Sequence, residues 1–172
     1  YTRDEMTKQM PYLKKKYLSY QKFAATTFPE MFGQDLLAKA ETQVANTFET
    51  CWFENVGGGK FKMRQLPVSA QFSSVDAILA DDVDADGNSD FLMAGNYYPI
   101  NIQMGRNDAS YGLLLRGNGK GHFASMPGVE SGFHVEGEVR KLLKLDVGGR
   151  TCYIAVRNND SVQAFMTVRS GK

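Results

Sequence analysis

Four aspartates lie within nine residues, at a spacing that predicts a metal site. Residues 82–90 read DVDADGNSD, with carboxylates at alternate positions, then glycine, then a last carboxylate. Such clustered negative charges repel one another unless a cation lies between them. Hard oxygen ligands suit Ca²⁺, which takes about 6–8 of them in flexible geometry, better than octahedral Mg²⁺. The predicted ligands of one structural Ca²⁺ are the side chains of Asp82, Asp84, Asp86 and Asp90 and the main-chain carbonyl of Asn88.

The beginning of this segment is like an EF-hand loop, but the rest is not. An EF-hand needs Glu at its twelfth position, and that position counted from Asp82 is Met93. Strand-like segments also flank the loop, and Gly87 permits the positive φ of a sharp reversal. We therefore expect a metal loop between two strands. A solvated acidic turn without metal is the alternative.

Other chemistry-bearing residues give weaker patterns. His122 and His134 could form a general base pair, but His122 stands in a glycine-rich turn and no GxSxG nucleophile motif is present. Residues 57–60 lack the spacing of a phosphate loop and predict a hairpin turn. The polar segment 106–111 supplies candidate ligand-binding residues, for which an Arg–Asp bridge that stiffens the loop is the alternative: Arg106, Asp108 and Tyr111.

The elements that must position these residues differ between the two ends of the chain. Residues 1–45 predict helices, since Thr2 and Glu5 have capping-box spacing and apolar residues recur at helical spacing. We expect this segment to pack on the rest of the chain through Tyr12, Leu13, Tyr17 and Phe23. From residue 46 to residue 172 the chain predicts strands separated by glycine and asparagine turns. The expected strands are residues 50–54, 60–66, 75–80, 90–95, 112–116, 139–145, 151–157 and 162–168.

An internal repeat indicates how these strands are organised. Residues 57–61 match 119–123, and residues 91–96 match 153–158, both at an offset of 62. A period of this length with about four strands is typical of a β-propeller blade. We expect the end of one blade, one complete blade and a third, degenerate blade. Because propellers close with roughly 4–8 blades, the chain is expected to be part of a longer protein, and it begins with Tyr1.

The third blade departs from the metal pattern. Where the acidic loop should recur, residues 145–150 read LDVGGR. One carboxylate remains there, and Arg150 replaces a ligand. The sequence therefore predicts one Ca²⁺ per chain.

Residues 78–92, which contain the acidic loop, resemble the FG-GAP/VCBS repeat of integrin-α-like propellers. The chain further resembles the C-terminal region of bacterial ASPIC/UnbV (cartilage-acidic-protein-like) proteins, especially those of Bacteroidetes. That resemblance is carried by residues 9–17, 66–72, 105–112, 131–133 and 137–140. It implies a seven-bladed propeller whose other blades are the partners of this chain. It also implies export to the periplasm or the cell surface.

Charge and cysteine content exclude several function classes. The 172 residues carry 20 Lys and Arg against 19 Asp and Glu, a net charge of +1, which argues against a nucleic-acid-binding surface. The apolar runs are too short to span a membrane. Cys51 and Cys152 lie far apart, and with two histidines in the chain they predict no zinc site. Two buried thiols are expected, with one disulfide as the alternative.

Two functions agree with these observations. The first is a calcium-stabilised, non-catalytic surface module that binds a protein or a glycan. The alternative is a non-catalytic or accessory part of a polysaccharide-acting enzyme, a lyase or hydrolase. A catalytic part would need acids or bases that converge in a pocket, and the sequence supplies no such pair.

Overall fold

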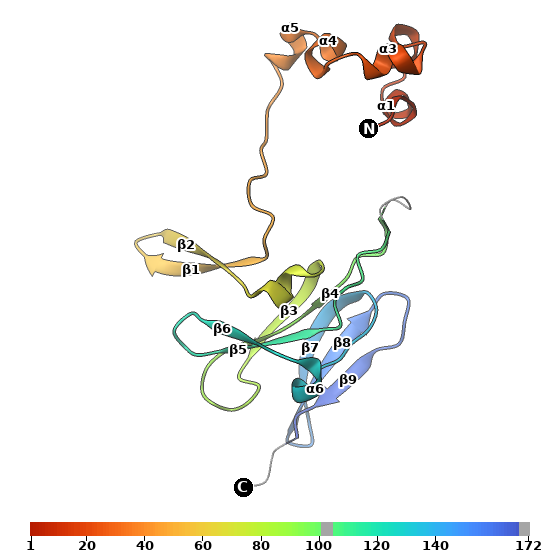
Figure 1. Cartoon of the computed structure of the whole chain (residues 1–172). Helices are drawn as coiled ribbons and strands as arrows, with labels where there is room; N and C mark the ends of the chain where they lie inside the picture. Colours follow the sequence, from red (N-terminus) through yellow and green to blue (C-terminus); the bar gives the residue numbers. More distant parts are fainter. Residues whose placement is uncertain (101–104, 169–172) are drawn as a thin grey trace. The chain divides into compact units, whose positions relative to one another are not determined.

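The computed structural model describes residues 1–100 and 105–168, and the chain divides into two compact units, Tyr1–Asn46 and Thr47–Lys172. The first unit is helical and the second is built mainly of strands (Figure 1). Within the described ranges, no helix has the length and apolar character needed to cross a bilayer.

The helical unit consists of five short helices with a small core of their own. Leu13, Tyr17 and Met31 are buried together, and the Tyr17 ring meets the Phe23 ring edge-on at 5.7 Å. The expected capping box at Thr2 and Glu5 is present. Leu13 and Tyr17 are thus buried by residues of the helical unit itself. The packing of the helical unit on the strands stays a prediction. The helices are α1 (Arg3–Gln9), α2 (Leu13–Lys16), α3 (Tyr20–Ala24), α4 (Phe28–Phe32) and α5 (Gln34–Leu37).

The second unit has nine strands, within the described residues, in three antiparallel sheets. The first sheet pairs β1 (Cys51–Gly57) with β2 (Lys60–Gln65). The second has the order β3 (Val75–Asp81), β4 (Asp90–Gly95), β5 (Leu113–Gly117), β6 (Phe123–Met126). The third has the order β7 (Val139–Val147), β8 (Arg150–Arg157), β9 (Gln163–Met166).

The mainly β architecture behind N-terminal helices is as expected, and each of the eight expected strands is present. Three elements were not expected: strand β6, the 3-10 helix η1 (Val68–Gln71) and the short helix α6 (Gly128–Ser131). β6 has four residues, Phe-Ala-Ser-Met, which do not alternate between apolar and polar side chains.

The second sheet is covered on both faces. Alternate side chains of a strand point to opposite faces. In β4, Leu92 and Ala94 belong to the core shared with the third sheet, while Met93 belongs to a cluster with Leu66, Ala70 and, from the first sheet, Trp52. In β5, Leu114 and Leu115 divide in the same way. Burial on both sides explains why β4 is a continuous apolar run rather than an alternating one.

Strand pairing recurs along the chain. Trp52 pairs with Arg64 in the first sheet, and Leu114 pairs with Met126 in the second, each residue number higher by 62. The β3–β4 ladder is irregular between Val75 and Ala77, and the β7–β8 ladder is irregular between Val139 and Lys141. In the second sheet, β3 therefore has its counterpart in β7 of the third sheet, and β6 has its counterpart in β2 of the first.

Candidate metal centre

The acidic loop connects β3 to β4 and brings three carboxylates together. One oxygen from each of Asp82, Asp84 and Asp86 lies within 4.8 Å of the other two. All three residues are exposed to solvent, with the Asp84 and Asp86 side chains partly covered. Three carboxylates at this separation could hold a metal ion, and their geometry by itself is not specific to Ca²⁺.

Backbone amides of the loop turn these carboxylates inward. Asp82 accepts hydrogen bonds from the backbone N–H of Asp86 at 3.0 Å and of Gly87 at 3.0 Å. The Asp86 carboxylate in turn accepts from the N–H of Asn88 at 2.8 Å. Gly87 has φ of +88° and Ala85 has φ of +61°, so the chain reverses tightly enough for these short-range bonds. The carboxylates that alternate in the sequence therefore come together in the folded loop.

Asp90 lies at the base of the loop rather than in the cluster. Its side chain is completely buried, and its two oxygens accept the backbone N–H of Gly117 at 2.9 Å and of Val83 at 3.0 Å. Asp90 thus joins the loop to β5. Each carboxylate oxygen keeps a second lone pair, and direct metal ligation by Asp90 stays a prediction.

Glycines of the β5–β6 hairpin make room for the loop. A Cβ added at Gly117 would clash with the carbonyl oxygen of Ser89, and one added at Gly119 would clash with the side-chain oxygen of Asn88. The loop therefore rests directly on this hairpin. Ligation by the main-chain carbonyl of Asn88 stays a prediction.

The sequence interpretation missed Arg116, which lies on β5. Its guanidinium forms an ion pair with Asp84, and it lies 3.8 Å from a carboxylate oxygen of Asp86. Arg116 thus supplies positive charge next to the carboxylate cluster. The missed signal was its place on the strand beside β4, where a side chain can reach the loop.

Asp81, the last residue of β3, was also missed. It accepts hydrogen bonds from the Lys144 ammonium at 2.6 Å and the Tyr153 hydroxyl at 2.7 Å, both from the third sheet. Burial opposes ionisation of Asp81, but these two bonds outweigh it and hold its pKa below the ordinary value. Burial, and then the bond to Asp81, raises the pKa of Tyr153. Asp81 therefore links the second and third sheets beside the loop.

The equivalent turn of the third sheet has no acidic cluster. Leu145 pairs with Cys152 as Asp81 pairs with Asp90. The ladder then continues through two further pairs to a turn at Gly148 and Gly149. The Asp146 carboxylate accepts the N–H of Gly149 at 2.9 Å. This tight hairpin leaves no room for a second loop of the same kind.

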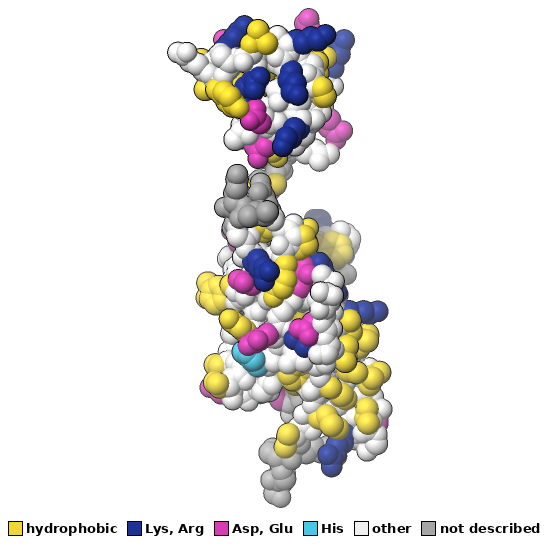
Figure 2. Space-filling model, turned by 90° about the vertical axis from the view of Figure 1, so that its right-hand side faces the viewer, with side chains coloured by type: hydrophobic (Ala, Val, Ile, Leu, Met, Phe, Trp, Pro, Cys, Tyr) yellow, Lys and Arg dark blue, Asp and Glu magenta, His cyan; other side chains and the backbone are white. Residues whose placement is uncertain are grey.

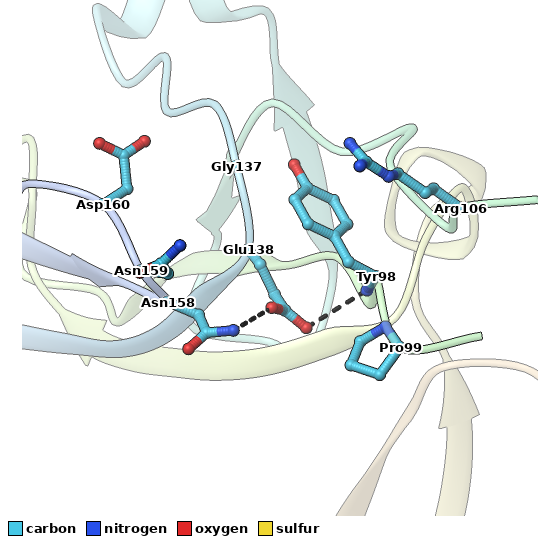
Figure 3. Close-up of a pocket in the computed structure, with 8 residues that line it drawn as sticks. All are labelled: Tyr98, Pro99, Arg106, Gly137, Glu138, Asn158, Asn159 and Asp160. Atoms are coloured by element: carbon cyan, nitrogen blue, oxygen red, sulfur yellow. Dashed lines mark hydrogen bonds between the residues drawn. The ribbon is translucent and has the colours of Figure 1, made fainter.

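A separate open cavity of about 490 Å³ lies between the segment after β4 and the turn after β8. Its buried Glu138 accepts hydrogen bonds from Asn158 Nδ2 at 2.6 Å and from the Tyr98 N–H at 3.2 Å (Figure 3). The Asn158 bond is the main cause that lowers the pKa of Glu138, and Arg140 at 2.5 Å adds to it. The lining residues are Tyr98, Pro99, Arg106, Gly137, Glu138, Asn158, Asn159 and Asp160.

The three candidate ligand-binding residues do not converge. Arg106 lines the cavity, with its guanidinium 5.0 Å from the centre of the Tyr98 ring. Tyr111 instead stacks on His134, with ring centres 5.2 Å apart. Asp108 is exposed, and within the described ranges no ion pair joins it to Arg106.

The two cysteines are both free, Cys152 buried and Cys51 half-buried. The buried-thiol interpretation therefore holds fully for Cys152 alone. Neither cysteine contributes to the carboxylate cluster of the acidic loop.

Comparisons with protein-family models, with curated proteins and with solved structures find no significant match for this chain. Its function must therefore be argued from the acidic loop, the cavity and the sheets themselves.

Proposed function

We propose that this chain is a calcium-stabilised, non-catalytic β-propeller module of an exported bacterial protein of the FG-GAP/VCBS and ASPIC/UnbV type, and that it binds a protein or a glycan. The observation that carries this proposal is the convergence of Asp82, Asp84 and Asp86 in a loop between adjacent antiparallel strands. A structural ion at this place would hold the loop on its sheet.

Strand pairing supports the propeller part of the proposal. A two-stranded, a four-stranded and a three-stranded antiparallel sheet follow one another along the chain. These numbers agree with the end of one blade, a complete blade and most of a third. The recurring register of β1–β2 in β5–β6 also favours repeated units of one kind. The remaining blades of a longer protein are the proposed partners.

The proposed role of Ca²⁺ is structural. The ion would take oxygens from Asp82, Asp84 and Asp86. Asp90 and the Asn88 carbonyl would add further oxygens towards the about 6–8 that Ca²⁺ prefers. Arg116 would then no longer be the main source of positive charge beside Asp84. Because the ligands come together only in the folded loop, binding energy adds to folding energy.

The cavity is the proposed ligand site, and its chemistry favours binding over catalysis. The Tyr98 ring and the Asn158 and Asn159 amides provide apolar and hydrogen-bonding surface together, as small-molecule sites do. Both carboxylates of the lining are already paired, Glu138 with Arg140 and Asp160 with Arg157. A general acid or base needs a free oxygen and a pKa near the working pH.

Calcium dependence is tested by thermal melting of the chelator-treated chain with added CaCl₂ or MgCl₂. A higher melting temperature with CaCl₂ is expected, and the triple variant D82N/D84N/D86N should lose it. An equal melting temperature with and without CaCl₂ would refute the metal role.

Ligand binding is tested on a glycan array, with a lyase assay on the hits. Arg106→Ala should weaken binding, whereas Arg64→Ala, on the first sheet, should not. Turnover of a bound glycan would favour the enzyme alternative instead.

A further inference from the structure

The buried residue Glu138 fixes two of the segments that line the open cavity. Its side chain is 1% exposed and accepts hydrogen bonds from the Tyr98 N–H and from the Asn158 amide. The backbone carbonyl of Glu138 also accepts the N–H of Asn158 at 2.8 Å. The segment after β4 and the turn after β8 are therefore both held at the cavity by bonds within the chain.

The buried residue Asn96 joins a third segment to the same place. It is 2% exposed, and its Nδ2 donates to the carbonyl of Ser110 at 2.8 Å and to the carbonyl of Gly137 at 3.0 Å. Its Oδ1 accepts the Ser110 N–H at 3.0 Å. A buried polar side chain with these partners satisfied makes the backbone around it rigid. The segment that begins at residue 105 is thereby fixed beside Gly137, which lines the cavity.

Backbone pairing places Arg106 at the cavity next to Tyr98. The Tyr97 N–H donates to the Asn107 carbonyl at 2.8 Å, and the Asn107 N–H donates to the Tyr97 carbonyl at 3.1 Å. In an antiparallel pair the next residues, Tyr98 and Arg106, lie opposite each other. The guanidinium is 5.0 Å from the centre of the Tyr98 ring. A guanidinium stacked on a ring keeps N–H donors at its edge for other partners.

The two carboxylates of the lining each have an arginine partner. Glu138 pairs with Arg140 at 2.5 Å, and Asp160 pairs with Arg157 at 2.9 Å. Charges of opposite sign also lie side by side on the face of the strand-built unit that Figure 2 shows. These four charges at the cavity therefore cancel in pairs.

Arg106 is the charge of the lining that has no such partner. Among residues 1–100 and 105–168, no carboxylate forms an ion pair with Arg106. The remaining residues, 101–104 (NIQM) and 169–172 (RSGK), contain no Asp or Glu. The cavity therefore presents one net positive charge, which suits an anionic ligand.

We propose that this cavity binds an acidic glycan, with the carboxylate of a uronic acid held by Arg106. The inference rests on the proposed function in one respect, that the cavity is the ligand site. The guanidinium fork donates two parallel hydrogen bonds to a carboxylate. The amides of Asn158 and Asn159 lie on the opposite side of the cavity from Arg106 (Figure 3), where they can bond to ring hydroxyls. An acidic protein side chain has no such hydroxyls beside its carboxylate, which favours a glycan over an acidic peptide.

Isothermal titration calorimetry of the full chain tests this inference with three probes, trigalacturonate, trimannuronate and a hyaluronan tetrasaccharide. Each probe carries carboxylates on sugar rings, and at least one of them should bind. The methyl-esterified form of the bound probe keeps the rings and loses the charge. It should bind about tenfold more weakly, because a charge-assisted hydrogen bond is about twice as strong as a neutral one.

Arg106→Gln should weaken binding of the acidic probe by about tenfold and leave the weaker binding of its methyl ester unchanged. Arg106→Lys keeps the charge without the fork, so its affinity should fall between those of Arg106→Gln and the parent chain. Arg150→Gln is the matched control, since it removes the same charge from an exposed arginine at the other end of β8. It should bind the acidic probe as the parent chain does.

Asn159→Gly removes an amide from the opposite side of the cavity. Asn159 has φ of +54°, which glycine adopts freely, so the turn should keep its conformation. This variant should weaken binding of the acidic probe and of its methyl ester alike. Thermal melting checks that each variant is folded, and if Arg106→Gln is not, Arg106→Lys and the methyl ester decide.

The failure of this inference differs from the failure of the proposed function. If no acidic probe binds, the inference is overturned; the ligand site stands if a neutral glycan binds with dependence on Asn159, and falls if no glycan binds. Equal binding of the acidic probe and its methyl ester, or equal binding by the parent chain and Arg106→Gln, would also overturn it. A tetraglutamate peptide that binds as tightly as the acidic glycan would overturn the choice of a glycan, because the carboxylate alone would then suffice.

Discussion

Replacing Asp90 by Ala should destabilise the strand-built unit even when no metal is present. The Asp90 carboxylate is completely buried and accepts the N–H of Gly117 and the N–H of Val83. The Gly117 bond is itself buried, so alanine leaves an amide with neither a protein partner nor water. Such an amide costs about 1–3 kcal/mol, and the half-buried Val83 bond adds about 0.5–1.5 kcal/mol. Together the loss is about 1.5–4.5 kcal/mol.

Urea unfolding monitored by the fluorescence of Trp52, the single tryptophan, measures this loss. Trp52 packs against the second sheet, so its emission reports on the unit that contains the loop. The midpoint for Asp90→Ala should fall in chelator and in CaCl₂ alike. In chelator, Asp84→Ala is the matched control: its carboxylate is partly exposed and pairs with Arg116, and a partly exposed ion pair contributes about 0–1 kcal/mol.

One result would refute this reasoning. If Asp90→Ala in chelator unfolds within about 0.5 kcal/mol of the parent chain, as surface substitutions do, then Asp90 does not hold the loop on β5. A loss seen in CaCl₂ alone would make Asp90 a metal ligand without a scaffold role.

Three further outcomes are expected. Asp86→Ala should abolish the rise in melting temperature with CaCl₂, because it removes the middle carboxylate of the cluster; calorimetry with and without chelator measures this. Tyr153→Phe should cost about 0.5–1.5 kcal/mol at neutral pH. Because the pKa of Asp81 is lowered from its ordinary value of 3.8, the ionised carboxylate stabilises the fold above pH 3.8. This stability is lost as the pH falls through the lowered pKa of the folded state. On acid titration, Tyr153→Phe should therefore lose less stability than the parent chain. Gly119→Ala should cost about 1–2 kcal/mol for its positive φ of +67°, plus the clash with Asn88, by urea unfolding.

The strands were predictable because their pattern is local. Short apolar runs bounded by glycine and asparagine turns place eight of the nine described strands, whereas the four residues of β6, Phe123–Met126, do not alternate between apolar and polar side chains and were missed. The helical end was predictable only in part. Its capping box was found, but the helical pattern does not show that the chain breaks at Tyr17 and folds back onto Met31.

The acidic cluster divides in the same way between sequence and tertiary structure. Asp82, Asp84 and Asp86 converge because amides of their own loop hold them, and bonds over two to five residues can be anticipated from spacing alone. The burial of Asp90 against Gly117, the approach of Arg116 to Asp84 and the bond from Tyr153 to Asp81 all join residues 27 to 72 positions apart. Such contacts depend on which strands become neighbours and on which sheet covers which, and this is decided when the apolar faces of the three sheets are buried against one another.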